Sequence, residues 1–74
     1  MTEYRRRFGD KECRIEVEWE NGTCLARLFT LEQEQSVPIL SEFGEPTVLT
    51  ATTPAWAYQR AVQFLTTRFG PEVQ

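Results

Sequence analysis

Three glutamates, Glu16, Glu18 and Glu20, alternate along one short stretch of the chain. Carboxylates that lie close together can hold a cation or exchange protons in acid–base catalysis. In an extended strand, however, successive members of this set stand ~7 Å apart, too far for one ion to bind them without further oxygen ligands. We therefore interpret the three glutamates as a solvated strand face, with no metal site.

Other catalytic chemistry lacks its usual residues. The chain has no histidine, which removes the commonest general base and metal ligand and any Ser–His or Cys–His pair. Its two cysteines, Cys13 and Cys24, cannot form a structural zinc site of the usual kinds by themselves. No glycine-rich phosphate-binding motif is present. We expect a protein that is not an enzyme, with no catalytic residue, metal or cofactor.

A cluster of three arginines, Arg5, Arg6 and Arg7, lies between Tyr4 and Phe8. Basic residues flanked by aromatic ones can bind single-stranded nucleic acid. The chain nevertheless has a net charge of −3, and three arginines release too few counterions for firm binding. We interpret the cluster as a solvated terminal segment, and keep RNA binding through Tyr4, the three arginines and a sheet face as the alternative.

Trp56 and Arg60 stand one turn apart on the polar side of a predicted helix. Tryptophan and arginine are enriched among the residues that contribute most binding energy in protein interfaces. The pair predicts either a protein-recognition site or a tryptophan packed under the 36–46 loop, with Arg60 stacked on its ring.

The helix itself is predicted for residues 54–69. Thr53 can cap its first free amides, and Pro54 fits the first helical position, where a missing N–H costs nothing. Gly70 can adopt the left-handed conformation that ends a helix, and Pro71 cannot continue it. The apolar side chains of the helix fall within one arc: Ala57, Tyr58, Ala61, Val62, Phe64, Leu65 and Phe69.

The clearest predicted strand covers residues 13–20, where apolar and polar side chains alternate. Asn21-Gly22 follows and predicts a two-residue type I′ turn, because both residues tolerate positive φ. Residues 23–31 form the return strand, with Trp19 opposite Cys24. The helix should then cover the face that carries Ile15, Val17, Trp19, Ala26 and Leu28.

The opposite face of this hairpin, here called the reverse face, carries Leu25, Phe29 and Leu31. One helix covers only one face of a sheet, so no predicted element buries these side chains. Together with Trp56 and Arg60 they form the predicted protein interface. The same register places Glu16 opposite Arg27, which predicts a cross-strand ion pair.

The remaining segments are less regular. Residues 1–10 form either a flexible basic arm or an edge strand, and residues 11–74 a single α+β domain. We expect a loop over 32–36, an edge strand or packed loop over 37–40 because of Pro38, a turn over 41–46, and a strand over 47–52.

Composition agrees with one small soluble domain. Charged residues make up 26% of the 74 positions, and no apolar run approaches the length that spans a bilayer. The predicted register separates Cys13 from Cys24 by roughly 20 Å, beyond the reach of a disulfide. Reduced thiols and the lack of a signal sequence suggest a cytoplasmic location.

The order strand–strand–strand–helix resembles the C-terminal part of double-stranded RNA-binding domains and is similar to the small domain of HicB-type antitoxins. The first family has a lysine cluster at the start of its last helix, where this chain has residues 53–56, Thr-Pro-Ala-Trp. The second family has Gly-Cys and Gly-Asp-Thr-like segments before the helix, which this chain lacks. The resemblance is one of topology and implies no function.

These observations predict an α+β fold: a small antiparallel sheet of three to four strands with one C-terminal helix packed on one face. The predicted function is a non-enzymatic protein-interaction module, a homodimer or a subunit of an assembly, with a protein partner or a second copy of itself. We expect no membrane partner, and no small-molecule substrate is evident.

Overall fold

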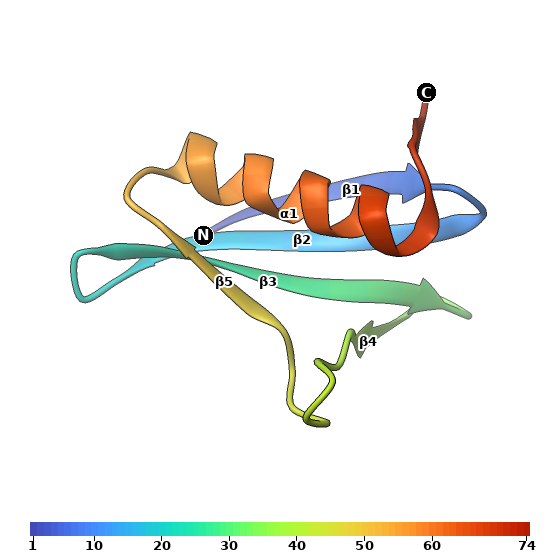
Figure 1. The fold of residues 1–74 in the computed structure, drawn as a ribbon, viewed down its shortest axis with the longest axis horizontal. Coiled ribbons are helices and arrows are strands. Elements are labelled where there is room, and N and C mark those ends of the chain that lie inside the picture. Colours follow the sequence, from blue (N-terminus) through green and yellow to red (C-terminus); the bar gives the residue numbers. More distant parts are fainter.

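The computed structural model covers residues 1–74 and contains one antiparallel sheet with a single helix packed against it (Figure 1). The elements are β1 (Thr2–Phe8), β2 (Lys11–Glu20), β3 (Thr23–Glu32), β4 (Gln35–Pro38), β5 (Val48–Ala51), α1 (Pro54–Phe69) and β6 (Glu72–Val73). The strands lie in the order β4-β3-β2-β1-β6, and β5 also pairs with β3. The α+β class and the C-terminal helix agree with the prediction.

The predicted number of strands, three to four, is wrong, because the sheet has six. At the N-terminus, β1 pairs with β2 from Thr2, opposite Val17, to Phe8, opposite Lys11. After the helix the chain turns back, and the two residues of β6 pair with the end of β1. A two-residue strand is too short to show any periodic pattern, so its position depends entirely on where the helix ends.

Of the two alternatives for residues 1–10, the structure has the strand. Phe8 is fully buried in the core. The ring of Tyr4 lies 4.4 Å from the ring of Tyr58 in α1, measured between centroids. The burial of Phe8 and the contact between Tyr4 and Tyr58 hold β1 in the domain.

The β2–β3 hairpin has the predicted register. Trp19 lies opposite Cys24, and the turn residues Asn21 and Gly22 have φ values of 52° and 79°. Cys13 and Cys24 are both buried and free. The prediction that they do not form a disulfide is therefore confirmed.

The polar segment 32–36 is not the loop that we predicted. Glu32 pairs with Gln35 across a two-residue turn, in which Gln33 and Glu34 have φ values of 52° and 66°. Because neither turn residue is glycine or asparagine, the usual hairpin signal is missing from the sequence. The edge strand that contains Pro38 agrees with one of the two predicted alternatives.

Strands β4 and β5 lie end to end along one edge of β3. β4 pairs with residues 29–32 of β3, and β5 with residues 24–27. Between the two, residues 40–46 leave the sheet as a small hairpin with a bridge between Leu40 and Pro46. The N–H of Ser41 donates to the carbonyl of Glu45 (2.7 Å), which confirms the predicted turn.

Helix α1 begins and ends where the sequence predicts. The hydroxyl of Thr53 accepts the N–H of Trp56 (3.2 Å). Gly70 ends the helix as predicted, but its φ of 121° and ψ of 176° lie outside the predicted left-handed helical conformation. The buried residues of the helix are Ala57, Ala61 and Leu65. They close a core to which the sheet and the segment after β4 contribute Phe8, Cys13, Ile15, Val17, Cys24, Ala26, Leu28 and Ile39. With 16 residues, α1 is neither long nor apolar enough to span a bilayer.

Trp19 is a further correction, because the helix does not cover it. Its register places it on the helix side of β2, yet 59% of the residue is exposed. The β2–β3 hairpin extends beyond the first turn of α1 (Figure 1). The indole therefore stands past the end of the element that would bury it.

Gly9 lies at a close contact between the β1–β2 turn and the end of the helix. Its φ is +60°, and its N–H donates to the carbonyl of Pro71 (3.0 Å). A Cβ at this position would lie 2.1 Å from the carbonyl oxygen of Phe69. Gly22 has a similar φ of +79°, but a Cβ there would meet nothing within 4 Å.

We expect Gly9→Ala to lower the free energy of unfolding by about 3 kcal/mol, because positive φ costs ~1–2 kcal/mol and relief of the overlap a similar amount. In the matched control, Gly22→Ala, only the positive φ should lower the free energy of unfolding. Urea denaturation followed by circular dichroism measures both variants. Equal losses would contradict the close contact between Gly9 and the end of α1.

Candidate interaction site

The reverse face holds the three apolar residues that the sequence places there. Leu25, Phe29 and Leu31 are all half-buried, although no helix covers them. The guanidinium of Arg14 lies over the ring of Phe29, 5.5 Å from its centroid. Part of this apolar surface is thus covered by a cation.

Arg14 and a second arginine, Arg27, form ion pairs with glutamates on the reverse face. Arg14 contacts Glu3 (3.0 Å) and Glu16, and also donates to the hydroxyl of Ser36 (3.0 Å). Arg27 contacts Glu18 and, at 3.4 Å, Glu20. The predicted Glu16–Arg27 pair is wrong, because Glu16 pairs with Arg14 and Arg27 reaches Glu18 and Glu20.

The carboxylate of Glu3 belongs to the same network. A hydrogen bond from Arg5 and the charge of Arg14 hold its pKa below the ordinary value. The side chain is exposed, so this pairing adds little to stability. Its effect is to leave the reverse face less apolar than the sequence alone indicates. The interface role of Leu25, Phe29 and Leu31 stays a prediction.

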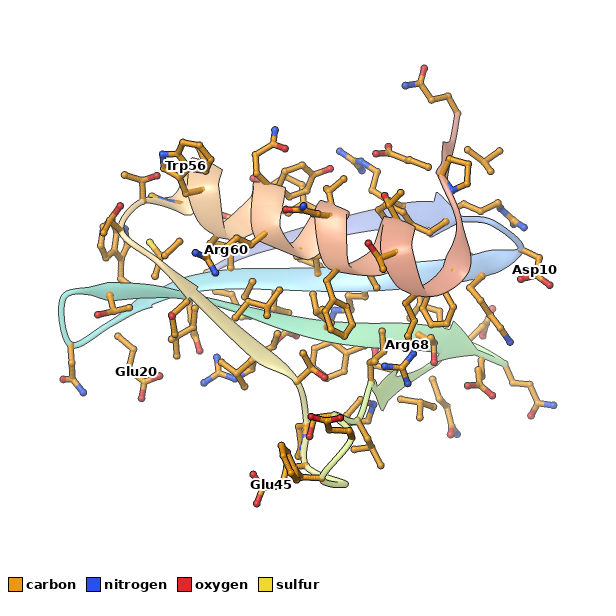
Figure 2. The ribbon with its side chains drawn as sticks, in the orientation of Figure 1. Asp10, Glu20, Glu45, Trp56, Arg60 and Arg68 are labelled. Carbon is orange, nitrogen blue, oxygen red and sulfur yellow. The ribbon has the colours of Figure 1, made fainter.

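Trp56 and Arg60 occupy a different surface, on the outer side of α1. Trp56 is 63% exposed, in the first turn of the helix. Figure 2 shows Arg60 pointing from the helix towards β5, with Arg68 at the far end of the helix. The alternative in which Trp56 packs beneath the 36–46 loop is thus wrong.

An open groove runs between α1 and β5 and joins these residues. It is called the α1–β5 groove below. Its lining consists of Leu49 from β5 and, from α1, Trp56, Gln59, Arg60, Val62, Gln63, Phe64, Thr67 and Arg68. A second, smaller hollow continues it towards the β2–β3 turn, beside Thr50, Ala51 and Thr52. Trp56 and Arg60 line both, so they stand where the two join.

The groove is basic, in a chain with an acidic balance. No aspartate or glutamate lines either hollow, and α1 contains none. Arg60 and Arg68 form no ion pair, whereas Arg5, Arg6, Arg14 and Arg27 each have an acidic partner. Arg68 instead lies over the ring of Phe64, 6.0 Å from its centroid. The groove therefore offers two free cations beside apolar and aromatic surface.

The N-terminal arginines are divided between the two faces of the sheet. Arg5 and Arg7 lie on the reverse face, opposite Arg14 and Glu12. Arg6 lies on the helix side, over the ring of Tyr4 (5.6 Å) and 3.8 Å from Glu72. A strand alternates its side chains, so three consecutive arginines cannot form one patch on a single face.

Sequence reasoning missed one exposed aromatic residue. Phe43 is 82% exposed at the tip of the 40–46 hairpin, next to Gly44 with a φ of +80°. The Ser41 hydroxyl accepts the N–H of Phe43 (3.2 Å), and the Ser41 carbonyl accepts that of Gly44 (3.0 Å). The signal available was an aromatic residue inside a predicted turn, where burial is not expected.

The structure brings together no group of three acidic or cysteine side chains that could hold a metal ion. Glu16 and Glu18 make ion pairs with arginines, and Glu20 contacts Arg27 as well. These carboxylates thus take part in the charge network of the reverse face.

A scan against protein-family models finds no match, and searches of curated proteins and of solved structures find no similar chain. The topological resemblance to RNA-binding domains and antitoxins therefore gains no support.

Both thiols should be unreactive in the folded protein. Burial raises the pKa of Cys13 from 9.0 to about 11, and also raises that of Cys24. We expect iodoacetamide to alkylate Cys13 at pH 8 about a hundredfold more slowly in the folded protein than in the chain unfolded in urea, since the pKa sets the fraction of thiolate. The Cys24→Ala variant leaves Cys13 as the only thiol, and mass spectrometry of timed samples measures its alkylation rate. Equal rates in the folded and unfolded protein would contradict the burial of Cys13.

The same shift predicts the direction of a pH effect on stability. The pKa of the Cys13 thiol is higher in the folded protein than in the unfolded chain. Its contribution to the stability of the folded state is therefore complete below about pH 9, and it is lost as the pH rises towards 11, because the unfolded chain ionises first. Urea midpoints measured across this range should fall less steeply for Cys13→Ala than for the native chain.

Proposed function

We propose that this chain is a small non-enzymatic protein-interaction module that acts in the cytoplasm as a homodimer or as a subunit of a larger assembly. The observation that carries the proposal is the exposure of Trp56, at 63%, on a regular capped helix. An indole on such a rigid element offers a large contact area at little entropic cost. Its neighbour Arg60 adds a cation without an ion pair.

The size of the domain supports a role that depends on association. A chain of this length buries only about 60% of the surface of its unfolded state, so contacts with a partner add substantially to its stability. Exposed apolar side chains are found on ordered segments elsewhere as well, at Trp19 and Phe43. Leu25, Phe29 and Leu31 provide a second surface, on which Arg14 and Arg27 would have to shift or contact the partner.

RNA binding through Tyr4, Arg5, Arg6 and Arg7 is the weaker proposal. The arginines point to both faces of the sheet, and Arg5 and Arg6 already contact glutamates. The phosphate backbone requires several free cations on one side of a protein.

Sedimentation equilibrium tests self-association and locates its surface. We expect the native chain to exceed its monomer mass of 8.6 kDa at high micromolar concentration. Phe29→Glu should weaken association about tenfold or more if the reverse face is used, and Trp56→Ala should do so if the helix surface is used, since central contacts dominate binding energy.

Gln33→Glu, in the exposed β3–β4 turn, is the matched control for an added negative charge and should leave the association unchanged. A chain that stays monomeric at these concentrations, with Phe29→Glu indistinguishable from it, would contradict the homodimer. A shift in mobility with RNA at low salt that is lost when all three N-terminal arginines are replaced would favour the weaker proposal.

A further inference from the structure

The outer edge of β5 carries unpaired backbone groups, and the hydrogen-bond pattern identifies them. In a two-residue hairpin the residues that flank the turn, here Glu20 and Thr23, form a hydrogen-bonded pair. Along β3, every second residue from Thr23 therefore bonds to β2, and the residues between bond to the other edge. The N–H of Ile39 donating to the carbonyl of Leu28 (3.0 Å) agrees with this alternation.

On that other edge, Cys24 lies opposite Ala51 and Ala26 opposite Leu49. Leu49 and Ala51 thus bond to β3, and the N–H and C=O groups of Val48 and Thr50 point outward. No strand pairs with β5 on this side. Val48 is 44% exposed, and Thr50 is exposed as well. Such an edge is a template on which an extended chain can add one more strand.

The edge lies beside the α1–β5 groove, which determines what kind of chain would fit. Leu49 and Phe64 provide apolar surface, and Arg60 and Arg68 provide positive charge with no acidic residue among them. The two arginines are eight residues apart on the helix, so roughly 12 Å along its axis. Four residues of an extended strand cover about the same distance, and side chains at that spacing point to the same face.

Resting on the proposed function, we propose that the edge of β5 and the α1–β5 groove bind an extended acidic segment of a partner protein, added to the sheet as a strand. Its backbone pairs with Val48 and Thr50. Carboxylates four residues apart contact Arg60 and Arg68, and an apolar side chain midway between them packs near Leu49 and Phe64.

The positive charge of the groove favours an acidic polypeptide over a second copy of the chain, and the free strand edge favours it over a nucleic acid. Twofold pairing of β5 with β5 of a second copy would bring Arg60 and Arg68 of both helices to one seam, with no acidic residue in either groove lining to offset them. A nucleic acid has the right charge but lacks backbone amides for the strand edge, and two arginines release too few counterions for firm binding. An acidic polypeptide satisfies both the edge and the cations.

The test uses a capped synthetic peptide, Thr-Glu-Thr-Val-Thr-Glu-Thr, and the full chain with Trp19→Phe, so that Trp56 is the only tryptophan. Titration at low salt should give a saturable change in Trp56 fluorescence. Arg60→Glu with Arg68→Glu should raise the dissociation constant about tenfold or more, since each reversal removes an attraction and adds a repulsion. The control is Lys11→Glu. Lys11 is exposed, lies outside the groove and forms no ion pair, so this charge reversal should change the dissociation constant by less than about twofold.

Two further peptides separate the charge from the strand. The version with lysines in place of both glutamates should not bind. A version with proline in place of the third residue keeps both glutamates but disrupts the added strand, and should bind about tenfold more weakly. Amide hydrogen exchange by NMR should show slower exchange at Val48 and Thr50 when the glutamate peptide is bound, because strand addition engages outward N–H groups.

The inference is overturned by any of three results: no saturable change with the glutamate peptide, equal binding of the lysine peptide, or binding that leaves exchange at Val48 and Thr50 unchanged. It is also overturned if exchange at these two amides slows with protein concentration alone, which would assign the edge to a second copy. Self-association sensitive to Phe29→Glu would survive all of these results, so the proposed function would stand while this inference failed.

Discussion

The pairing of β2 with β3 is the constraint on which the rest of the molecule depends. A two-residue turn at Asn21-Gly22 leaves only one register, and that register assigns each side chain of both strands to a face. Ile15, Val17, Ala26 and Leu28 go to the helix side and join the core, and Leu25, Phe29 and Leu31 go to the other side. A slip of β3 by one residue would move Leu25, Phe29 and Leu31 to the helix side and turn Ala26 and Leu28 away from it.

The two faces of the sheet limit their exposed apolar surface by different means. On one face α1 excludes water with Ala57, Ala61 and Leu65, whose small or compact side chains allow the helix to lie close to the strands. On the reverse face no helix is available. The guanidinium of Arg14 lies over the ring of Phe29 instead, and Arg14 and Arg27 pair with glutamates. This arrangement limits exposed apolar area without a second layer, but it also draws charged groups partly out of water, since the side chains of Arg14 and Glu16 are only 22% and 13% exposed.

The edge of β3 explains why the groove exists. β4 and β5 together pair with nearly the full length of this edge, but the chain leaves it between them to form the 40–46 hairpin. β5 therefore emerges as a short separate strand that leads directly into α1, and the helix returns over the sheet beside it (Figure 1). The free edge of β5, the groove and the cations of α1 are brought together by this one connection.

The sequence alone determined the features that depend on local chemistry. Thr53, Pro54 and Gly70 specify the ends of the helix, Asn21-Gly22 specifies the hairpin, and the alternation over residues 13–20 specifies its faces. Tertiary structure decided the rest. The sixth strand, the turn at Gln33-Glu34 and the exposure of Trp19 have no local signal, because each depends on where a distant element ends or what lies above it. Likewise Trp56 and Arg60 were recognisable as a pair, but β5 had to be placed beside them before they formed a groove.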